Sequence, residues 1–435
     1  MTHTDDALLA RRARLLGPAY RLFYEQPLHL VRGEGVWLYD RDGRRYLDAY
    51  NNVASVGHAH PQVVQAIARQ AATLNTHTRY LHEGVLDYAE RLLAQLPPAL
   101  GQAMFTCTGS EANDLALRIA QAHTGASGLI VTRHAYHGVT APTAEASPAL
   151  GAQGPRSDRV RTVAAPLAAP SAARLTGQTA ADEVGRRFAD GVREAIADLR
   201  AHGLAPAALL VDTVFSSDGV FTAPAGFLAE AVAAVREAGG VFIADEVQPG
   251  FGRTGEAFWG FARHGLVPDI VTMGKPMGNG HPVAGLAVRP EVLAAFGHQC
   301  RYFNTFGGNP VSMAAASAVL DVIKQQDLQA NALRVGEHLR QRLRGLAQRH
   351  ALIGEVRGAG LFIAVDLVAD RDSGAPAATA TAQVVNGLRQ HGVLLSATGP
   401  LASTLKIRPP LVFELAHADL LVDTLDQVLR TLAAA

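Results

Sequence analysis

Residues 241–275 read VFIADEVQPGFGRTGEAFWGFARHGLVPDIVTMGK and determine the fold that we expect for this chain. Two short apolar runs within them, Val241–Ala244 and Asp269–Met273, have the composition of buried parallel strands. Asp245 follows the first run directly, and Lys275 comes just after the second. Ligands bind at the carboxyl edge of open α/β sheets, so both side chains are expected in one cleft.

An amine and a carboxylate at such an edge suggest an aldehyde cofactor held as a Schiff base. Lys275 would form the imine, and Asp245 would keep a ring nitrogen of the cofactor protonated. Taken singly, each residue has a plainer interpretation. Asp245 alone would more often cap a helix, and Lys275 alone would more often be a solvated loop lysine.

The motif ADEVQPGFGRTG at 244–255, followed by MGK at 273–275, resembles the class III aminotransferases, which use pyridoxal 5'-phosphate. Further motifs follow in the family's order over nearly the whole chain. The resemblance implies an α/β fold of fold type I, with a mostly parallel central sheet flanked by helices and a smaller α+β domain built from both termini. We expect residues 1–57 to form the N-terminal arm and hairpin, 58–310 the large cofactor-binding domain, and 311–435 the rest of the small domain.

Composition narrows the function classes. The 435 residues are 48% hydrophobic, which is typical of a globular protein, and 39 basic residues balance 39 acidic ones. This balance favours neither nucleic acid nor an anionic membrane as a partner. Two cysteines make no disulfide framework, the first residues make a poor signal or transit peptide, and no stretch of eighteen apolar residues appears. A cytoplasmic location fits best.

Residues 104–118, MFTCTGSEANDLALR, predict a strand followed at once by a helix. Free amides at a helix N-terminus bind anions, so we assign Gly109 and Ser110 to the cofactor phosphate. An ordinary helix N-cap is the alternative, and similarity of this stretch to a family motif favours the phosphate. Glu111 and Asn113 should face the cleft from the first helical turn.

The remaining cofactor contacts are implied by the resemblance. Tyr136 would stack on the cofactor ring, Val247 would pack under it, and Gln248 would bond its phenolic oxygen. Asp212 occupies the place of a family glutamate that supports the cofactor's acid. Thr305 matches a threonine that binds the phosphate of the partner subunit's cofactor, which implies a homodimer with shared sites.

Other patterns in the sequence do not indicate a further metal, nucleotide or catalytic site. His58 and His60 in GHAHP suggest a metal site, but no cysteine or acid completes the ligand set, so we expect them to order a loop. The glycine-rich runs GFGRTG and MGNG lack the features of a P-loop. Residues 141–200 show no chemical constellation.

Two departures from the family bear on the reaction. Lys406, in LKIRPPL, stands where many class III transaminases carry a carboxylate-binding arginine, and Ser217 replaces a gate glutamate. Lysine does not match a carboxylate bidentately, so transamination with 2-oxoglutarate is doubtful. The chain is most similar to the ammonia-phospholyase branch, which acts on phosphoethanolamine or phosphohydroxylysine, and the similarity lies in LDAYNNV, RYLHEGVLDYAERL, TGSEANDLALR, DIVTMGKPMGNGHPVA, YFNTFGGNPVS and LLSATGP with LKIRPP.

We therefore expect β-elimination on a small O-phosphorylated or phosphonate-bearing primary amine. Transfer of the amino group to a 2-oxo acid is the alternative, and a cofactor-binding protein without catalysis is a third hypothesis. Candidates for binding the substrate's anionic group are Arg79, His82, Lys406 and Arg408.

Overall fold

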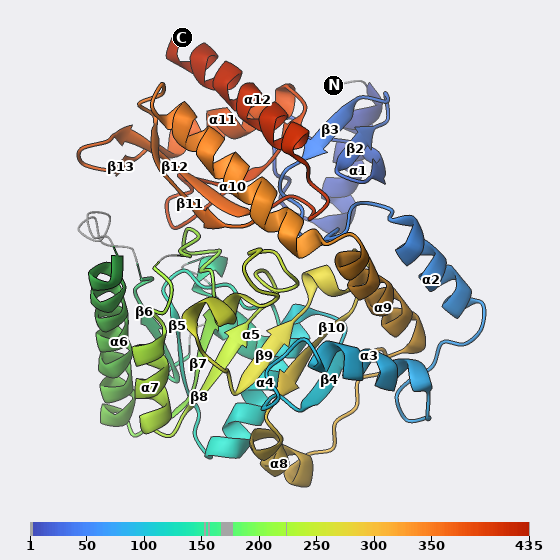
Figure 1. The fold of residues 1–435 in the computed structure, drawn as a ribbon, viewed down its shortest axis with the longest axis vertical. Helices are drawn as coiled ribbons and strands as arrows, with labels where there is room; N and C mark the ends of the chain where they lie inside the picture. The colour runs from blue at the N-terminus through green and yellow to red at the C-terminus, as the bar shows by residue number, and fades with distance from the viewer. Residues whose placement is uncertain (1–2, 152–153, 155–156, 167–176, 223, 435) are drawn as a thin grey trace.

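The computed structural model describes residues 3–151, 154, 157–166, 177–222 and 224–434. Within these residues the chain forms three β-sheets surrounded by helices (Figure 1). The largest sheet has seven strands, and the predicted α/β class is confirmed. In order across the sheet they are β4 (Gln102–Thr106), β10 (Ala284–Val288), β9 (Ile270–Met273), β8 (Val241–Asp245), β7 (Pro206–Asp212), β5 (Gly128–Thr132) and β6 (Val160–Val163). The two predicted apolar runs are the neighbouring parallel strands β8 and β9, and only β10 runs antiparallel to its neighbours.

Helices cover both faces of this sheet, which explains why its strands are apolar on both sides. Alternate residues of a strand point to opposite faces. Ile243 accordingly packs with α4 (Gly109–Thr124) on one face, while Phe242 and Ala244 belong to the cluster on the other face. That second face is covered by α6 (Gly177–Ala201) and α7 (Ala229–Glu237), which lie side by side in Figure 1.

Further helices among the described residues surround the same sheet and its connections. They are α2 (Pro61–Ala71), α3 (Glu83–Leu93), α5 (Ala141–Glu145), α8 (Pro290–Gln299), α9 (Pro310–Gln325) and the short 3-10 helix η4 (Lys275–Gly278). Lys275 opens η4, directly after β9 and Gly274.

The second sheet joins the two ends of the chain. It contains β1 (Leu30–Glu34), β2 (Trp37–Asp40), β3 (Arg45–Asp48) and β14 (Val393–Leu394). A turn at 40–43 connects β2 to β3, and the hairpin expected within residues 1–57 is extended by a third strand, β1. β14 pairs in parallel with β3, with Val393 opposite Leu47.

The third sheet lies in the C-terminal part. Its strands are β11 (Ile353–Ala359), β12 (Phe362–Asp370), β16 (Thr404–Ile407) and β15 (Ser396–Thr398), with β13 (Ala375–Pro376) paired to β12. The helices α10 (Leu328–Ala347), α11 (Ala378–Gln390) and α12 (Leu415–Ala434) pack around it at the top of Figure 1. The proposed domain limits remain a prediction.

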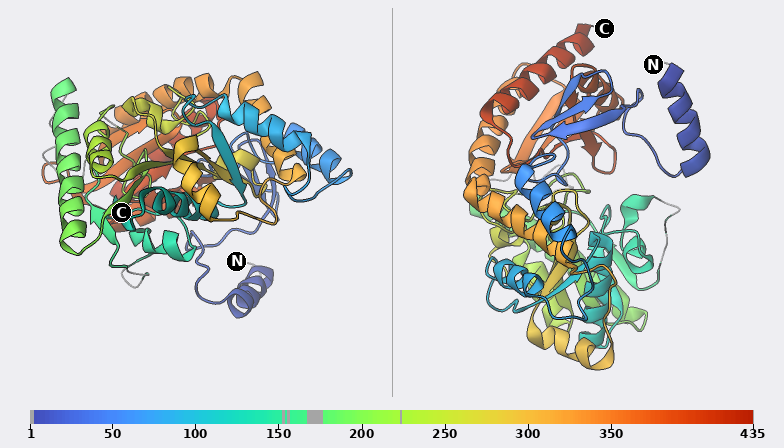
Figure 2. Two further views of the ribbon diagram at one scale, coloured as in Figure 1. Left: turned by 90° about the horizontal axis from the view of Figure 1, so that it is seen from below. Right: turned by 90° about the vertical axis from the view of Figure 1, so that its right-hand side faces the viewer.

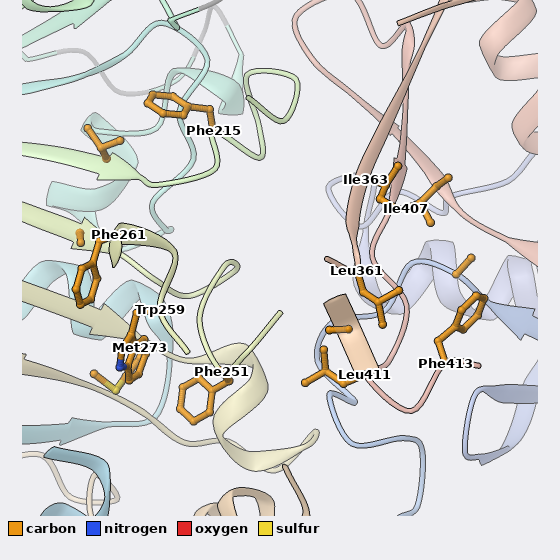
Figure 3. Close-up of a cluster of buried hydrophobic side chains, with 14 of the residues drawn as sticks. Phe215, Phe251, Trp259, Phe261, Met273, Leu361, Ile363, Ile407, Leu411 and Phe413 are labelled. Atoms are coloured by element: carbon orange, nitrogen blue, oxygen red, sulfur yellow. The ribbon is translucent and has the colours of Figure 1, made fainter. Parts of the chain in front are cut away.

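One continuous hydrophobic cluster connects the central sheet to the C-terminal part (Figure 3). Phe215, Trp259 and Met273 contribute to it from the central-sheet side, and Leu361 and Ile407 contribute from the other side. Because apolar packing of this kind resists sliding, it fixes the position of β16 relative to the edge where β8 and β9 end.

The N-terminal helix α1 (His3–Leu16) lies at the edge of the molecule in Figure 2, where Asp5 is 3.5 Å from His29 Nδ1 and 3.8 Å from Arg41 Nη1. Among the described residues, no helix has both the length and the apolar character that crossing a bilayer requires.

Candidate active site

The carboxyl ends of β7, β8 and β9 bring the two predicted catalytic residues to one cavity. Asp212 lies opposite Asp245 in the sheet register, Asp245 lies opposite Thr272, and Lys275 follows three residues later. The cavity is lined by Gly109, Ser110, Asn113, Tyr136, His137, Gly138, Asp212, Asp245, Val247, Gln248 and Lys275. Except for Thr305, the predicted cofactor contacts all line it.

Asp245 is buried and held by three donors. Asn113 Nδ2 donates to its Oδ2 at 2.9 Å, His137 Nδ1 lies 2.7 Å from the same oxygen, and the Val247 amide donates to Oδ1 at 3.1 Å. Asn113 is itself fixed, because Thr272 Oγ1 donates to its Oδ1 at 2.6 Å. These donors fix the orientation of the carboxylate, and its remaining lone pairs can accept a hydrogen bond from a ring nitrogen.

Lys275 shares this region with a second cation. Burial first, and then the nearby Arg408 guanidinium, lower the pKa of Lys275 to about 8, while Asp245 and Asp212 act in the opposite direction. A lysine amine is a nucleophile only when neutral, so this environment prepares Lys275 to form an imine near neutral pH.

The N-terminus of α4 forms another wall of the cavity. Thr108 and Glu111 make a reciprocal capping box, so the Glu111 carboxylate is used by the helix end rather than facing the cleft. In the described part of the chain, the amides of Gly109 and Ser110 have no acceptor. A Cβ at Gly109 would lie 3.0 Å from Val247 Cγ2. Glycine therefore allows the start of α4 to pack closely against the loop that follows β8.

Asp212 lies at the end of β7 and accepts hydrogen bonds from the amides of Val214 and Ser216 at 3.0 and 3.1 Å, and from Ser216 Oγ. Burial raises its pKa, and the neighbouring Asp245 raises it further. Tyr136 also lines the cavity, and burial followed by the charge of Asp245 raises the pKa of its phenol.

Two of the substrate candidates approach the cavity from β16 and the residues after it. Lys406 and Arg408 are each only 6% exposed. Burial and the charge of Arg408 lower the pKa of Lys406 well below its usual value, while Asp212 opposes this effect. No carboxylate among the described residues forms an ion pair with Lys406, Arg408 or Lys275. Lys406 and Arg408 are therefore buried basic side chains without a paired acid in the described chain, and an anion beside them would favour their charged forms.

The other predicted residues lie outside the cavity of a single chain. Arg79 is exposed and its guanidinium carbon lies 3.7 Å from the centre of the Phe303 ring. His82 caps α3, with its Nδ1 accepting from the Gly84 amide at 3.1 Å. Thr305 is exposed in a bend before α9.

His58 and His60 are placed as loop residues. His58 Nε2 lies 2.7 Å from the buried carboxylate of Asp48, which also accepts from the Tyr50 and Asn51 amides. His60 Nε2 lies 3.3 Å from Gln326 Nε2. The His58–Asp48 pair therefore orders the loop that leads to Tyr50.

The structure adds three residues that the sequence did not single out. Ser147 Oγ accepts from the His137 and Gly138 amides, so residues 141–200 do contribute to the site, contrary to expectation. Ser216 connects Asp212 to Gln248. Glu246 is buried, and its carboxylate accepts from Thr213 Oγ1, the Gly260 amide and the Phe261 amide at 2.7 Å each.

The family model for aminotransferase class III matches residues 23–429. The chain is 42% identical to an alanine–glyoxylate aminotransferase 2-like protein of Drosophila melanogaster, over 94% of this chain and 84% of that one. It is 38% identical to the ethanolamine-phosphate phospho-lyase homolog 1 of Caenorhabditis elegans, over 98% and 94%. Among solved structures, a phospholyase from Arthrobacter in complex with phosphoethanolamine superposes with a TM-score of 0.93 at 44% identity, covering 98% of this chain and 99% of the other.

Proposed function

The chain belongs to the class III aminotransferase family and is an enzyme of it, and from that premise we propose that it binds pyridoxal 5'-phosphate between β8, η4 and α4. The residues present fit this cofactor. The α4 end offers two amides without acceptors, Asp245 presents a buried carboxylate, and Lys275 presents a buried amine with a lowered pKa. An amine transaminase at 29% identity and TM-score 0.85 is described in its PLP-bound form.

Each part of the cofactor would have a holder. Gly109 and Ser110 would receive the phosphate at the N-terminus of α4, where amides and the helix dipole favour anions. Tyr136 and Val247 would enclose the ring, and Asp245 would hold a proton on its nitrogen. When bound, the cofactor supplies an aldehyde that takes up a primary amine and a ring that accepts electrons from the adjacent carbon. Lys275 Nζ is then placed to remove and return the proton of that carbon.

The pair of buried cations Lys406 and Arg408 supports an anionic substrate. Neither side chain forms an ion pair with a carboxylate of the described chain, so a phosphate group of the substrate would supply the missing negative charge. Lysine binds phosphate as a point charge and lacks the fork geometry with which arginine matches a carboxylate. This observation favours a phosphate-bearing amine over a dicarboxylic amino acid.

For such a substrate we propose β-elimination as the reaction. With phosphoethanolamine, the proton leaves the carbon that carries nitrogen, the bond from the next carbon to oxygen breaks, and phosphate departs. One water molecule is consumed in releasing acetaldehyde and ammonia. The similarities to the Arthrobacter phospholyase and to the C. elegans phospho-lyase homolog support this proposal.

Transamination is the second candidate, and the 42% identical aminotransferase 2-like protein of D. melanogaster favours it. In that case Lys275 would return the proton to the cofactor side, and a 2-oxo acid would be needed to complete each cycle. The two candidates therefore differ in whether an amino acceptor is required.

The deciding experiment incubates the purified holoenzyme with phosphoethanolamine and no 2-oxo acid. Release of phosphate, acetaldehyde and ammonia in equal amounts supports elimination. If product forms only after pyruvate or glyoxylate is added, and phosphate stays on the carbon chain, transamination replaces elimination. Lys275→Ala, which should also lose the yellow colour, is the inactive control.

Lys406→Met tests the anion site, because it should weaken the apparent affinity for phosphoethanolamine.

We also propose that the active enzyme is a homodimer. Aromatic and apolar side chains gather beside Thr305: Tyr80 is 66% exposed, Leu81 is fully exposed and Phe306 is 68% exposed. The two segments that carry them are adjacent, since the rings of His77 and Phe303 lie 5.7 Å apart. A second copy would cover this patch and receive Thr305 at its cofactor phosphate. Sedimentation of the purified protein tests the dimer.

A cytoplasmic location is proposed on the two unpaired cysteines, Cys107 and Cys300, which suit a reducing compartment. The 38% identical relative in Arabidopsis thaliana and the 35% identical relative in Homo sapiens are described as mitochondrial, so fractionation of the source cells is the test.

A further inference from the structure

The buried guanidinium of Arg408 donates a hydrogen bond to a neutral side chain and not to an acid. Its backbone amide donates to the Ala49 carbonyl at 2.9 Å, and its guanidinium carbon lies 4.4 Å from the centre of the Tyr50 ring. The side chain is buried, and no acidic residue in the described chain pairs with it. Instead, Nη1 donates to Oε1 of Gln248, a neutral side chain that lines the cavity.

This contact determines which end of the Gln248 carboxamide faces which partner. Arginine can only donate hydrogen bonds, so the atom beside it must be the carboxamide oxygen. The nitrogen of Gln248 then lies at Ser216, and Nε2 donates to Ser216 Oγ. A glutamine held at one end only could present either atom to a ligand, whereas this one cannot rotate without losing both bonds.

The direction of the hydrogen bonds is fixed at the far end as well. Ser216 Oγ accepts from Gln248 Nε2 and donates its own single hydrogen to Asp212 Oδ2. Donation therefore runs one way, from Arg408 to Gln248, from Gln248 to Ser216 and from Ser216 to Asp212. Gln248 Nε2 carries two hydrogens and donates one of them to Ser216 Oγ. Its remaining hydrogen makes Gln248 a donor toward the cavity.

We propose that Arg408 is a positioning residue that holds Gln248 with a hydrogen-bond donor directed at the bound cofactor. This inference rests on the proposed use of pyridoxal 5'-phosphate. It assigns Arg408 and Lys406 different tasks although both are buried cations of the same strand end. Among the described residues no hydrogen bond joins Lys406 to Gln248, so Lys406 remains available to the substrate's anion, while Arg408 acts through the carboxamide.

A double-mutant cycle tests this assignment. The dissociation constant of pyridoxal 5'-phosphate and the absorption maximum of the bound cofactor are measured for the wild type, Arg408→Met, Gln248→Ala and the double variant. Arg408→Met should weaken cofactor binding by at least about tenfold in the wild-type background. In the Gln248→Ala background the same change should cost less than about twofold. Arg408→Met and Gln248→Ala should displace the absorption maximum equally, and the double variant should displace it no further.

Lys406→Met is the matched control, because it removes a buried basic side chain from the same region that has no hydrogen bond to Gln248 in the described chain. Its effect on cofactor affinity should be the same in both backgrounds. An Arg408→Met cost that persists after Gln248→Ala would overturn the proposal and leave Arg408 as a charge alone. If Arg408→Met does not fold, Arg408→Lys replaces it in the same cycle. Its cost in cofactor affinity must likewise disappear in the Gln248→Ala background. A wild type that fails to bind the cofactor would instead overturn the proposed function.

Discussion

His137 Nδ1 lies 2.7 Å from Asp245 Oδ2, and both side chains are buried. Because a carboxylate accepts, the histidine nitrogen at this contact must donate. His137 is fixed in turn by its backbone amide, which donates to Ser147 Oγ at 2.8 Å. The pair therefore fixes the orientation of the Asp245 carboxylate before any ligand arrives.

We expect His137→Phe to weaken binding of pyridoxal 5'-phosphate by about 10- to 100-fold, since a hydrogen bond to a charged group contributes about 1.5–3 kcal/mol. Equilibrium dialysis of the apoenzyme measures the change. His264→Phe is the control, because His264 is also buried but lies outside the cavity, with Nε2 3.3 Å from the Thr213 carbonyl. Equal losses in both variants would contradict a specific role of the His137–Asp245 contact.

The rate at which the apoenzyme takes up pyridoxal 5'-phosphate should increase with pH around a midpoint near 8. The pKa of Lys275 is lowered to about 8 by burial and by Arg408, so the amine is mostly protonated and unreactive below that pH. Stopped-flow absorbance across pH 6 to 10 measures the profile, and a midpoint near 10.5 in the wild type would contradict the burial of this amine.

Glu246 should make the stability of the protein fall as pH rises from about 4.5 to 7. Burial raises its pKa to about 7, so in this range the folded protein binds more protons at Glu246 than the unfolded chain does. Glu246→Gln lacks this titration, and its decline over the same range should be less steep. Denaturant unfolding at pH 5 and pH 7.5 gives the change in the free energy of unfolding for both proteins. The other carboxylates contribute equally to both changes, so their difference reports Glu246. Parallel declines would show that Glu246 titrates at its ordinary pKa.

Thr305→Ala should weaken cofactor binding by about tenfold, because it removes a hydroxyl that would donate to a charged phosphate. Thr305→Ser keeps the hydroxyl and should bind nearly as the wild type does. Both variants should sediment as the wild type. If the alanine variant retains the cofactor fully while dimeric, the shared-site proposal fails.

The positions of Asp245 and Lys275 could be predicted from the sequence because they depend on local patterns. Two apolar runs of strand length predict β8 and β9, and a residue at a strand end lies at the sheet edge whatever the rest of the chain does. The capped start of α4 could be predicted for the same reason, since Thr108 and Glu111 are only three residues apart.

The roles of Ser216 and Ser147 could not be predicted in this way. Ser216 contacts Asp212 and Gln248 from a loop in which Phe215 and Val220 adopt positive φ angles of 53° and 64°. Such angles are rare for bulky residues and leave no trace in composition. Ser147 is ten residues from His137 in the chain, and only the fold of α5 brings the two together. The third strand β1 was missed because most of its residues are exposed and its pattern is not alternating.

The pairing of β14 with β3 has a consequence for biosynthesis. Leu47 leaves the ribosome 346 residues before its partner Val393, as 393 − 47 shows. At 5–20 residues per second, the edge of β3 waits roughly 20–70 s for its neighbour. Arg408, whose amide donates to Ala49, emerges later still. The nascent chain can assemble its central sheet early, but it acquires a complete cofactor pocket only when translation is almost finished, and chaperones have that interval in which to protect its N-terminal strands.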